Sequence, residues 1–274
     1  MQNACALLRK KIAERKRLPY RGCRCSPKER AVHLRKKILS LVVAGALGFG
    51  AVGFACACAL PPTSSSLQGT GKAPISLQLW LPYCSAKKVL PYGTEAVSEL
   101  MLLHYWGIPA GLDNVVSSLS QTPLQTLSGT LTGPDPEKSF AGSPRKKGSG
   151  GCFARPVKQS LAQFLPPLLK AQDTSGTSLE TLIQKYVSAG QPVLLWATEK
   201  MDMPAAALSW QMPAGGTCFW PKNTDCMVLV GYDPNGCWLE DPMGDSGPTY
   251  WKKPLVNSRY EALGRHSLVV YRTA

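Results

Sequence analysis

The chain has 274 residues, ten cysteines and a formal net charge of +14. Residues 1–37 contain 13 Lys or Arg against two acidic residues, a net +11, so only +3 of the excess belongs to the rest of the chain. This distribution argues against a nucleic-acid-binding face on the main domain, because most of the net positive charge lies at one end. The remaining length allows one domain of about 200 residues, enough to bury a full core without disulfides.

An uncharged run of 23 residues, 38–60, follows the basic end and is long enough to cross a bilayer as a helix. It predicts a single-pass signal-anchor in the cell membrane, with residues 1–37 as a cytoplasmic tail and the main domain extracytoplasmic. A cleaved signal peptide is the alternative, because residues 55–59, ACACA, offer the small side chains that a signal peptidase accepts. Residues 61–76, which begin with a stretch rich in Pro, Ser and Gly, are expected to form a flexible linker.

The ten cysteines show no metal-binding arrangement. Cys23 and Cys25 form a C-x-C pair without further spaced ligands, and the five cysteines of the main domain leave at least one unpaired. No phosphate loop or dinucleotide fingerprint is present either. We therefore expect no cofactor and no bound metal.

The first strong element of the main domain is a helix over residues 94–106, which follows a turn made by Pro91 and Gly93. Apolar residues recur in it at three- and four-residue spacing, which predicts one buried face. The first amides of a helix lack intrahelical partners and favour an anion there. The start of this helix, at Thr94 and Glu95, is therefore the first candidate for a functional site.

A long Gly, Pro and Ser stretch, residues 128–151, comes next and has neither a helix nor a strand period. One interpretation is a solvated surface loop, with Lys146 and Lys147 as solvated charges. The other is a lid or groove wall, because long ordered loops in compact domains often border binding sites.

The later elements complete an α+β pattern. Residues 157–171 predict a helix broken at Pro166 and Pro167. Residues 178–189 predict another, with a Ser-x-x-Thr start and an end at Gly190. Helices thus dominate the first half and strands the second, which favours α+β over a doubly wound sheet. The predicted strands are short apolar runs at 191–198, 226–233 and 267–273.

Six segments, in this order, resemble the peptidase C39-like family, the papain-like relatives of bacteriocin-processing cysteine peptidases. They are residues 90–107, 133–144, 150–157, 178–198, 225–233 and 238–245. The resemblance implies a papain-like fold over residues 77–272, with an N-terminal helix packed on a mostly antiparallel sheet, in a bacterial protein.

The resemblance also implies four catalytic positions. The oxyanion glutamine of the family falls on Ala86, the cysteine nucleophile on Thr94, the histidine base on Asp225, and the orienting Asp or Asn on Asp241. Only Asp241 keeps the family's residue type. Acyl transfer needs a nucleophile, a base and oxyanion donors, so a hydroxyl, a carboxyl and a methyl group at the other three positions indicate a degenerate site.

Other residues of the chain are weak substitutes for these groups. His33 precedes the apolar run, His104 lies about 15 Å along the helix from Thr94, and His266 is in the last strand pair. Cys84 is close to the expected site in sequence but has no visible histidine partner, so it is interpreted as a small apolar residue. Cys226 is interpreted as packed inside the sheet.

Aromatic residues gather in the strand-rich half, where the resemblance would place the cleft. We expect Glu95, Trp210 and Trp220 to be cleft residues, the two tryptophans because they lie in a polar, Pro- and Gly-rich segment, 201–223. A cleft with such rings and no nucleophile would still bind an extended peptide or a glycan.

Three functions remain open at this point. The first is a pseudopeptidase that binds a peptide, a cell-wall fragment or a partner protein, with Thr94, Asp225 and Asp241 lining the cleft. The second is an active cysteine-type peptidase or amidase with an unrecognised nucleophile, in which a group such as Cys84 or His266 is folded back towards Thr94. The third is a structural envelope protein whose cleft is filled by its own side chains.

Overall fold

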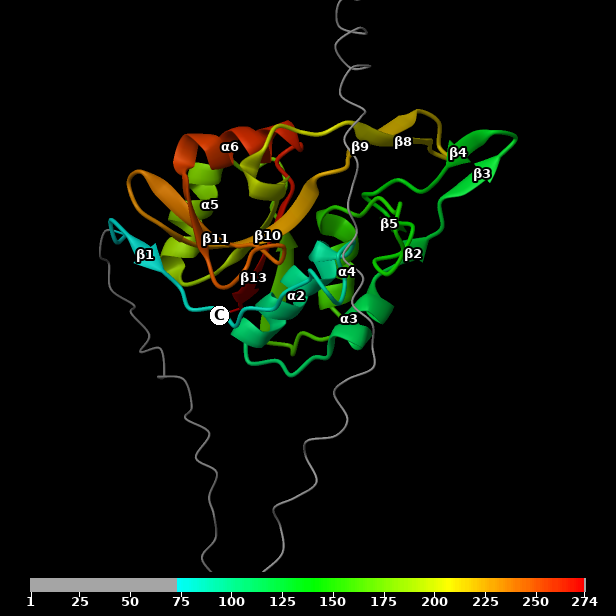
Figure 1. The fold of residues 1–274 in the computed structure, drawn as a ribbon. Helices are drawn as coiled ribbons and strands as arrows, with labels where there is room; N and C mark the ends of the chain where they lie inside the picture. Colours follow the sequence, from blue (N-terminus) through cyan, green and yellow to red (C-terminus); the bar gives the residue numbers. More distant parts are fainter. Residues whose placement is uncertain (1–72, 274) are drawn as a thin grey trace, which may run out of the picture. The chain divides into compact units, whose positions relative to one another are not determined.

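The centre of the computed structural model is a seven-stranded antiparallel sheet, and the structure describes residues 73–273 (Figure 1). Its strands run in the order β12-β11-β10-β7-β13-β6, and β1 pairs with the far end of β10. The strands are β1 (Leu77–Gln78), β6 (Leu169–Asp173), β7 (Val193–Thr198), β10 (Thr224–Tyr232), β11 (Gly236–Glu240), β12 (Thr249–Lys252) and β13 (Ser267–Arg272). The predicted strands at 191–198, 226–233 and 267–273 are confirmed.

Helices cover both faces of this sheet (Figure 1). One face carries α2, α3 and α4, and the other carries α5, η1 and α6. The helices are α2 (Thr94–Tyr105), α3 (Leu112–Ser118), α4 (Ala154–Leu161), α5 (Leu179–Lys185) and α6 (Lys253–Ala262), with short 3₁₀ turns η1 (Val187–Ala189) and η2 (Glu199–Met201).

Burial on both faces explains why the central strands are continuous apolar runs. Along β7, Leu194 and Trp196 pack into the core under α2, whereas Val193 and Leu195 pack into the core under α5 and α6. The helix predicted at 94–106 is confirmed as α2. The helix predicted at 178–189 is α5 followed by η1, with the Ser178 hydroxyl accepting a hydrogen bond from the Thr181 amide and Gly190 left-handed at the end.

One of the expectations for the irregular segments needs correction. The segment 157–171 is not one broken helix, because α4 ends at Leu161 and the residues after the prolines form β6. The segment 201–223, which shows no clear strand pattern in the sequence, contains the hairpin of β8 (Ala207–Gln211) and β9 (Thr217–Pro221).

The stretch 128–151 also takes part in small sheets. Strand β4 (Thr130–Thr132) joins β3 (Gln125–Leu127) to β8, and β5 (Phe140–Ala141) pairs with β2 (Gln121–Thr122). These strands are only two to five residues long, too short to give a sequence period.

The predicted basic tail and membrane anchor, residues 1–60, lie outside the described residues. Within residues 73–273, none of the helices combines the length and the apolar character needed to cross a membrane.

Candidate functional site

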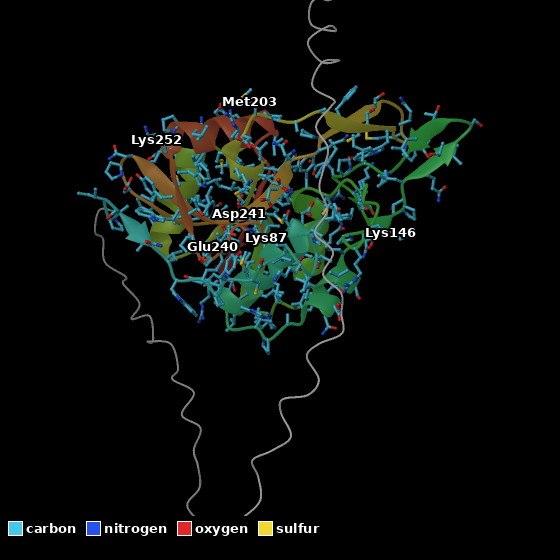
Figure 2. The ribbon with its side chains drawn as sticks, in the orientation of Figure 1. Lys87, Lys146, Met203, Glu240, Asp241 and Lys252 are labelled. Atoms are coloured by element: carbon cyan, nitrogen blue, oxygen red, sulfur yellow. The ribbon has the colours of Figure 1, made fainter. Side chains whose placement is uncertain are left out.

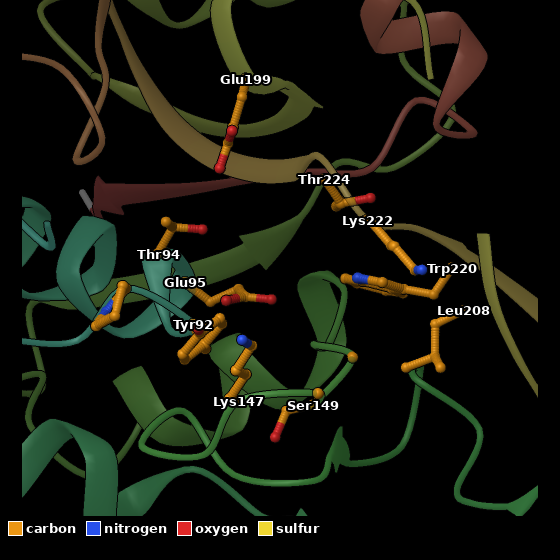
Figure 3. Close-up of a pocket in the computed structure, with 13 residues that line it drawn as sticks. Tyr92, Thr94, Glu95, Lys147, Ser149, Glu199, Leu208, Trp220, Lys222 and Thr224 are labelled. Carbon is orange, nitrogen blue, oxygen red and sulfur yellow. The ribbon is translucent and has the colours of Figure 1, made fainter. Parts of the chain in front are cut away.

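A pocket of about 370 Å³ opens at the N-terminus of α2 (Figure 3). Thr94 and Glu95 of α2 line it, with the turn before the helix on one side and the 147–150 loop on another. The wall is completed by Leu208 of β8, Trp220 of β9, Lys222 in the turn after β9, Thr224 at the start of β10, and Glu199. The stretch 128–151 is therefore a groove wall in part, and Lys147 lines the pocket although it is exposed.

Thr94 joins α2 to the central sheet. Its hydroxyl oxygen accepts a hydrogen bond from the backbone N–H of Cys226, at 3.1 Å, and the Ser98 hydroxyl, one turn later, donates to the Cys226 carbonyl at 2.7 Å. Cys226 lies two residues before β10 begins to pair with β11 at Val228. The helix thus satisfies a buried peptide group that the next strand does not reach.

Replacing Thr94 with Val is therefore expected to lower the free energy of unfolding by about 1 to 3 kcal/mol, because the buried amide of Cys226 loses its acceptor. Thr94→Ser keeps the hydroxyl and should cost about 1 kcal/mol or less, the value of one buried methyl group. Urea denaturation of the two variants measures the difference. Equal stability of the two would contradict the structural role of the hydroxyl.

Asp225 and Asp241 lie close together next to Thr94, but they are not exposed in the pocket. Asp225 is 1% exposed, and neither of its carboxyl oxygens has a partner in good hydrogen-bonding geometry among the described residues. Burial raises the pKa of Asp225 well above its ordinary value, and the neighbouring Asp241 raises it further. The expectation that both residues line the cleft is corrected: among the four family positions, Thr94 alone lines this pocket.

Ala86 lies close to the segment that carries Asp241. It is buried, and its backbone N–H donates to the carbonyl of Pro242, the residue after Asp241, at 2.9 Å. The structure thus brings Ala86, Thr94, Asp225 and Asp241 into one region, although a methyl group at Ala86 provides no hydrogen-bond donor.

Glu95 is a buried titratable group in the wall of the pocket. Its carboxylate accepts a hydrogen bond from the Cys152 amide at 3.0 Å, and burial raises its pKa to about 7. Gly151 makes this approach possible, because a Cβ atom at that position would collide with both the Glu95 carboxylate and the Trp220 ring. The carboxyl of Glu95 is consequently part protonated at neutral pH.

The two tryptophans expected in the cleft have different positions. Trp220 lines the pocket and packs against Phe153, with ring centroids 4.9 Å apart. Trp210 does not line it. Its side chain is 1% exposed, and its indole N–H donates to the Pro134 carbonyl at 2.7 Å. Gly133 and Gly150 leave room for the indole, so Trp210 is a core residue between the small strands.

No thiol and imidazole meet beside this pocket among the described residues. His104 is within 3.0 Å of the Ala110 carbonyl, and His266 stacks on Phe153 with ring centroids 3.6 Å apart. Burial lowers the pKa of His266 to about 4, so its 3.2 Å approach to Glu137 is not an ion pair at neutral pH. Cys84 is half-buried, and burial raises the pKa of its thiol.

Sequence reasoning missed Lys222, Glu199 and Leu208, because nothing in their local pattern distinguishes them from other surface residues. Their place in the wall depends on how β8 and β9 fold over the start of α2. Lys222 lies beside Trp220, and Lys147 lies near Tyr92 and Glu95 (Figure 3). Two cations therefore border a pocket whose interior carries carboxyl groups.

Comparisons with known proteins agree with this architecture. The model of the Peptidase_C39 like family matches residues 79–268, well over half of the chain. The chain belongs to this family. A crystal structure of a Bacillus anthracis protein assigned as a C39-like peptidase matches with a TM-score of 0.63 and 23% identity, over 70% of this chain and 95% of that one. This likeness shows the shared fold.

A second solved structure is more distant. It is a double glycine motif protease from an AMS/PCAT transporter, in complex with the leader peptide, with a TM-score of 0.39 and 14% identity over 72% of this chain and 94% of that one. This likeness is too weak to carry an argument. A comparison with curated proteins found no match.

Proposed function

We propose that this protein is a non-catalytic member of its family that binds an extended peptide in the pocket at the start of α2. The observation that carries the proposal is the state of the two positions where the family resemblance implies a nucleophile and a base. Thr94 uses its hydroxyl oxygen to hold the Cys226 amide, and Asp225 is buried beside a second carboxyl group.

Each of these states opposes acyl transfer. Burial and the neighbouring Asp241 raise the pKa of Asp225, which favours its neutral form and opposes a role as a general base. A threonine hydroxyl without a base is a weak nucleophile. Ala86 supplies no donor for an oxyanion, and the loss of one such donor costs about 10² to 10³ in rate.

Binding remains available because the pocket is open. A volume of about 370 Å³ is within the range of small-ligand sites and favours binding over the structural envelope alternative, in which side chains of the protein would fill the cleft. Gly148 on one wall has open space where a Cβ atom would stand, which allows a peptide backbone to approach closely. Trp220 supplies an aromatic surface on the other wall.

The active-hydrolase alternative has less support. It needs a thiol and an imidazole in contact beside Glu95, and His104 and His266 each have other partners. Burial raises the pKa of the thiols of Cys152 and Cys226, which opposes the thiolate form that such chemistry requires.

The test is retention of short peptides from a mixed pool by the full-length protein, followed by mass spectrometry of the bound fraction. We expect intact peptides to be bound, and Trp220→Ala to weaken their binding about 10-fold or more, because aromatic contacts in clefts contribute strongly. Phe219→Ala is the matched control: the neighbouring residue on β9 is 71% exposed and does not line the pocket. Lys222→Glu probes the rim without touching the core.

Cleavage of the peptides by the natural protein would overturn the proposal. Equal binding by the Trp220→Ala, Lys222→Glu and Phe219→Ala variants would show that the ligand occupies another site.

We also propose that residues 38–60 tether the domain to the cell membrane with residues 1–37 in the cytoplasm. The uncharged run and the net +11 before it support this arrangement. Full-length protein should stay in the membrane fraction after alkaline carbonate extraction, and protease added outside the membrane should digest residues 73–274. Release by carbonate would favour the cleaved signal peptide instead.

A further inference from the structure

A second pocket, of about 360 Å³, shares no residue with the pocket at Thr94. It lies between the chain that follows β1 and the segment that follows β11, and its walls include Trp80, Tyr83, Glu240 and Pro248. Glu240 ends β11 and directly precedes Asp241 (Figure 2). Since consecutive strand residues point to opposite faces of a sheet, the carboxyl groups of Glu240 and Asp241 lie on opposite sides of the strand.

Glu240 has a carboxyl group that the described residues leave without a partner. Its side chain is only 2% exposed, yet it lines the pocket, and its buried Oε2 has no hydrogen-bond donor. Burial raises the pKa of Glu240 to about 7, and no charged group among the described residues contributes to the shift. An unsatisfied buried carboxyl is costly, and a cation placed in the pocket would relieve that cost.

An aromatic surface faces the same pocket. Trp80 is 79% exposed, an unusual state for the largest apolar side chain. Tyr83 is held in place because its hydroxyl donates to the Gly244 carbonyl at 2.8 Å. Aromatic faces next to a carboxylate are the environment in which alkylammonium groups bind, because the ring quadrupole and the negative charge both attract the cation.

We propose that this pocket binds an alkylammonium group of a peptide, with Glu240 as its counter-ion and the Trp80 ring against its methylene groups. The amine can come from a lysine side chain or from a peptide N-terminus. The inference does not depend on the pocket at Thr94, because the two pockets have separate walls.

The test is a calorimetric titration of the full-length protein with each of two peptides, which measures their binding. The two peptides carry the amine in different places. Acetyl-Gly-Lys-Gly-amide has a lysine side chain and blocked ends, and Gly-Ala-Gly-amide has only a free N-terminus. We expect at least one to bind, and Glu240→Gln and Trp80→Ala each to weaken its binding about 10-fold or more. Phe219→Ala, which removes an exposed ring elsewhere, should leave it unchanged.

A third peptide, in which the amine of the bound peptide is acetylated, is the control for the charge. Three results would overturn the proposal: no binding of either amine peptide, undiminished binding by Glu240→Gln, or equal binding of the acetylated peptide. If Glu240→Gln does not fold, Trp80→Ala decides the question, because so exposed a side chain can be removed without disturbing the core. Trp220→Ala distinguishes this site from the pocket at Thr94, since it should not change the binding of the amine peptides.

Discussion

The combined replacement Thr94→Cys and Asp225→His is expected to give a protein that cleaves peptides at least about 10³-fold faster than the natural chain. The structure supports the change because α2 begins at Thr94, where a thiolate would gain from the helix N-terminus. Asp241 lies beside position 225 and would orient the new imidazole. Release of a fluorescent group from a mixed library of quenched peptides measures the gain.

The single replacements are the controls for this gain. A nucleophile and its base act as a unit, so Thr94→Cys alone and Asp225→His alone should both remain near the natural rate. Adding Ala86→Gln should raise the rate further by about 10²-fold if the side chain finds room, because it restores an oxyanion donor. An inert double variant that folds and still binds peptide would show that the family positions have been assigned to the wrong residues.

The second large effect concerns stability and pH. The pKa of Glu95 is about 7 in the folded protein, against 4.5 for an ordinary glutamate, so the folded state binds more protons than the unfolded state between these values. Stability from this group is therefore fully present below about pH 4.5 and is lost as the pH rises through 7. For Glu95 alone the loss between pH 5 and pH 8 is about 2 to 3 kcal/mol.

Three other buried carboxyls add to the loss, and one histidine opposes it. Burial raises the pKa of Glu240 to about 7, and it raises those of Glu99 and Asp225 well above the ordinary range. The pKa of His266 is lowered from 6.5 to about 4, so this group adds stability as the pH rises between these values. The net fall should therefore be steepest between about pH 6.5, where the histidine stops opposing it, and about pH 7, where the Glu95 carboxyl becomes ionised in the folded state as well.

Glu95→Gln isolates the contribution of one group, because an amide oxygen can still accept the hydrogen bond from the Cys152 amide. Urea denaturation at pH 5 and pH 8 should show that this variant loses about 2 to 3 kcal/mol less than the natural protein over that interval. Glu180→Gln, which replaces an exposed carboxyl, is the matched control. An identical pH dependence of Glu95→Gln and natural protein would mean that the Glu95 carboxyl is ionised in the fold at acid pH.

Several parts of the fold could be predicted because a single physical signal specified them. The central strands β7, β10 and β13 are apolar on both faces, so their runs were visible without knowledge of their partners. Helix α6 was missed, since only Val256 and Tyr260 of its ten residues are buried and its pattern is therefore faint. The hairpin of β8 and β9 was missed because most of its residues are exposed or half-buried.

The functional site also contains some residues that could be predicted from the sequence and others that could not. The turn before α2 placed Thr94 and Glu95 at a helix start, and Trp220 was expected in the cleft. Trp210 was not distinguished from Trp220, because both lie on one hairpin and only tertiary packing puts one in the core and the other on the pocket. The burial of Asp225 beside Asp241 also depends on packing, and no local pattern signals it.

The hydrogen bonds that join Thr94 and Ser98 to the Cys226 peptide group also limit which sequence changes the chain can accept one at a time. Sulfur is a weak hydrogen-bond acceptor, so a change from threonine to cysteine at position 94 alone would weaken the attachment of α2 to the sheet. A catalytic benefit also needs a histidine at a second position. Under the proposed non-catalytic function, the single change at Thr94 would therefore lower stability without adding activity, which favours keeping the pocket for binding.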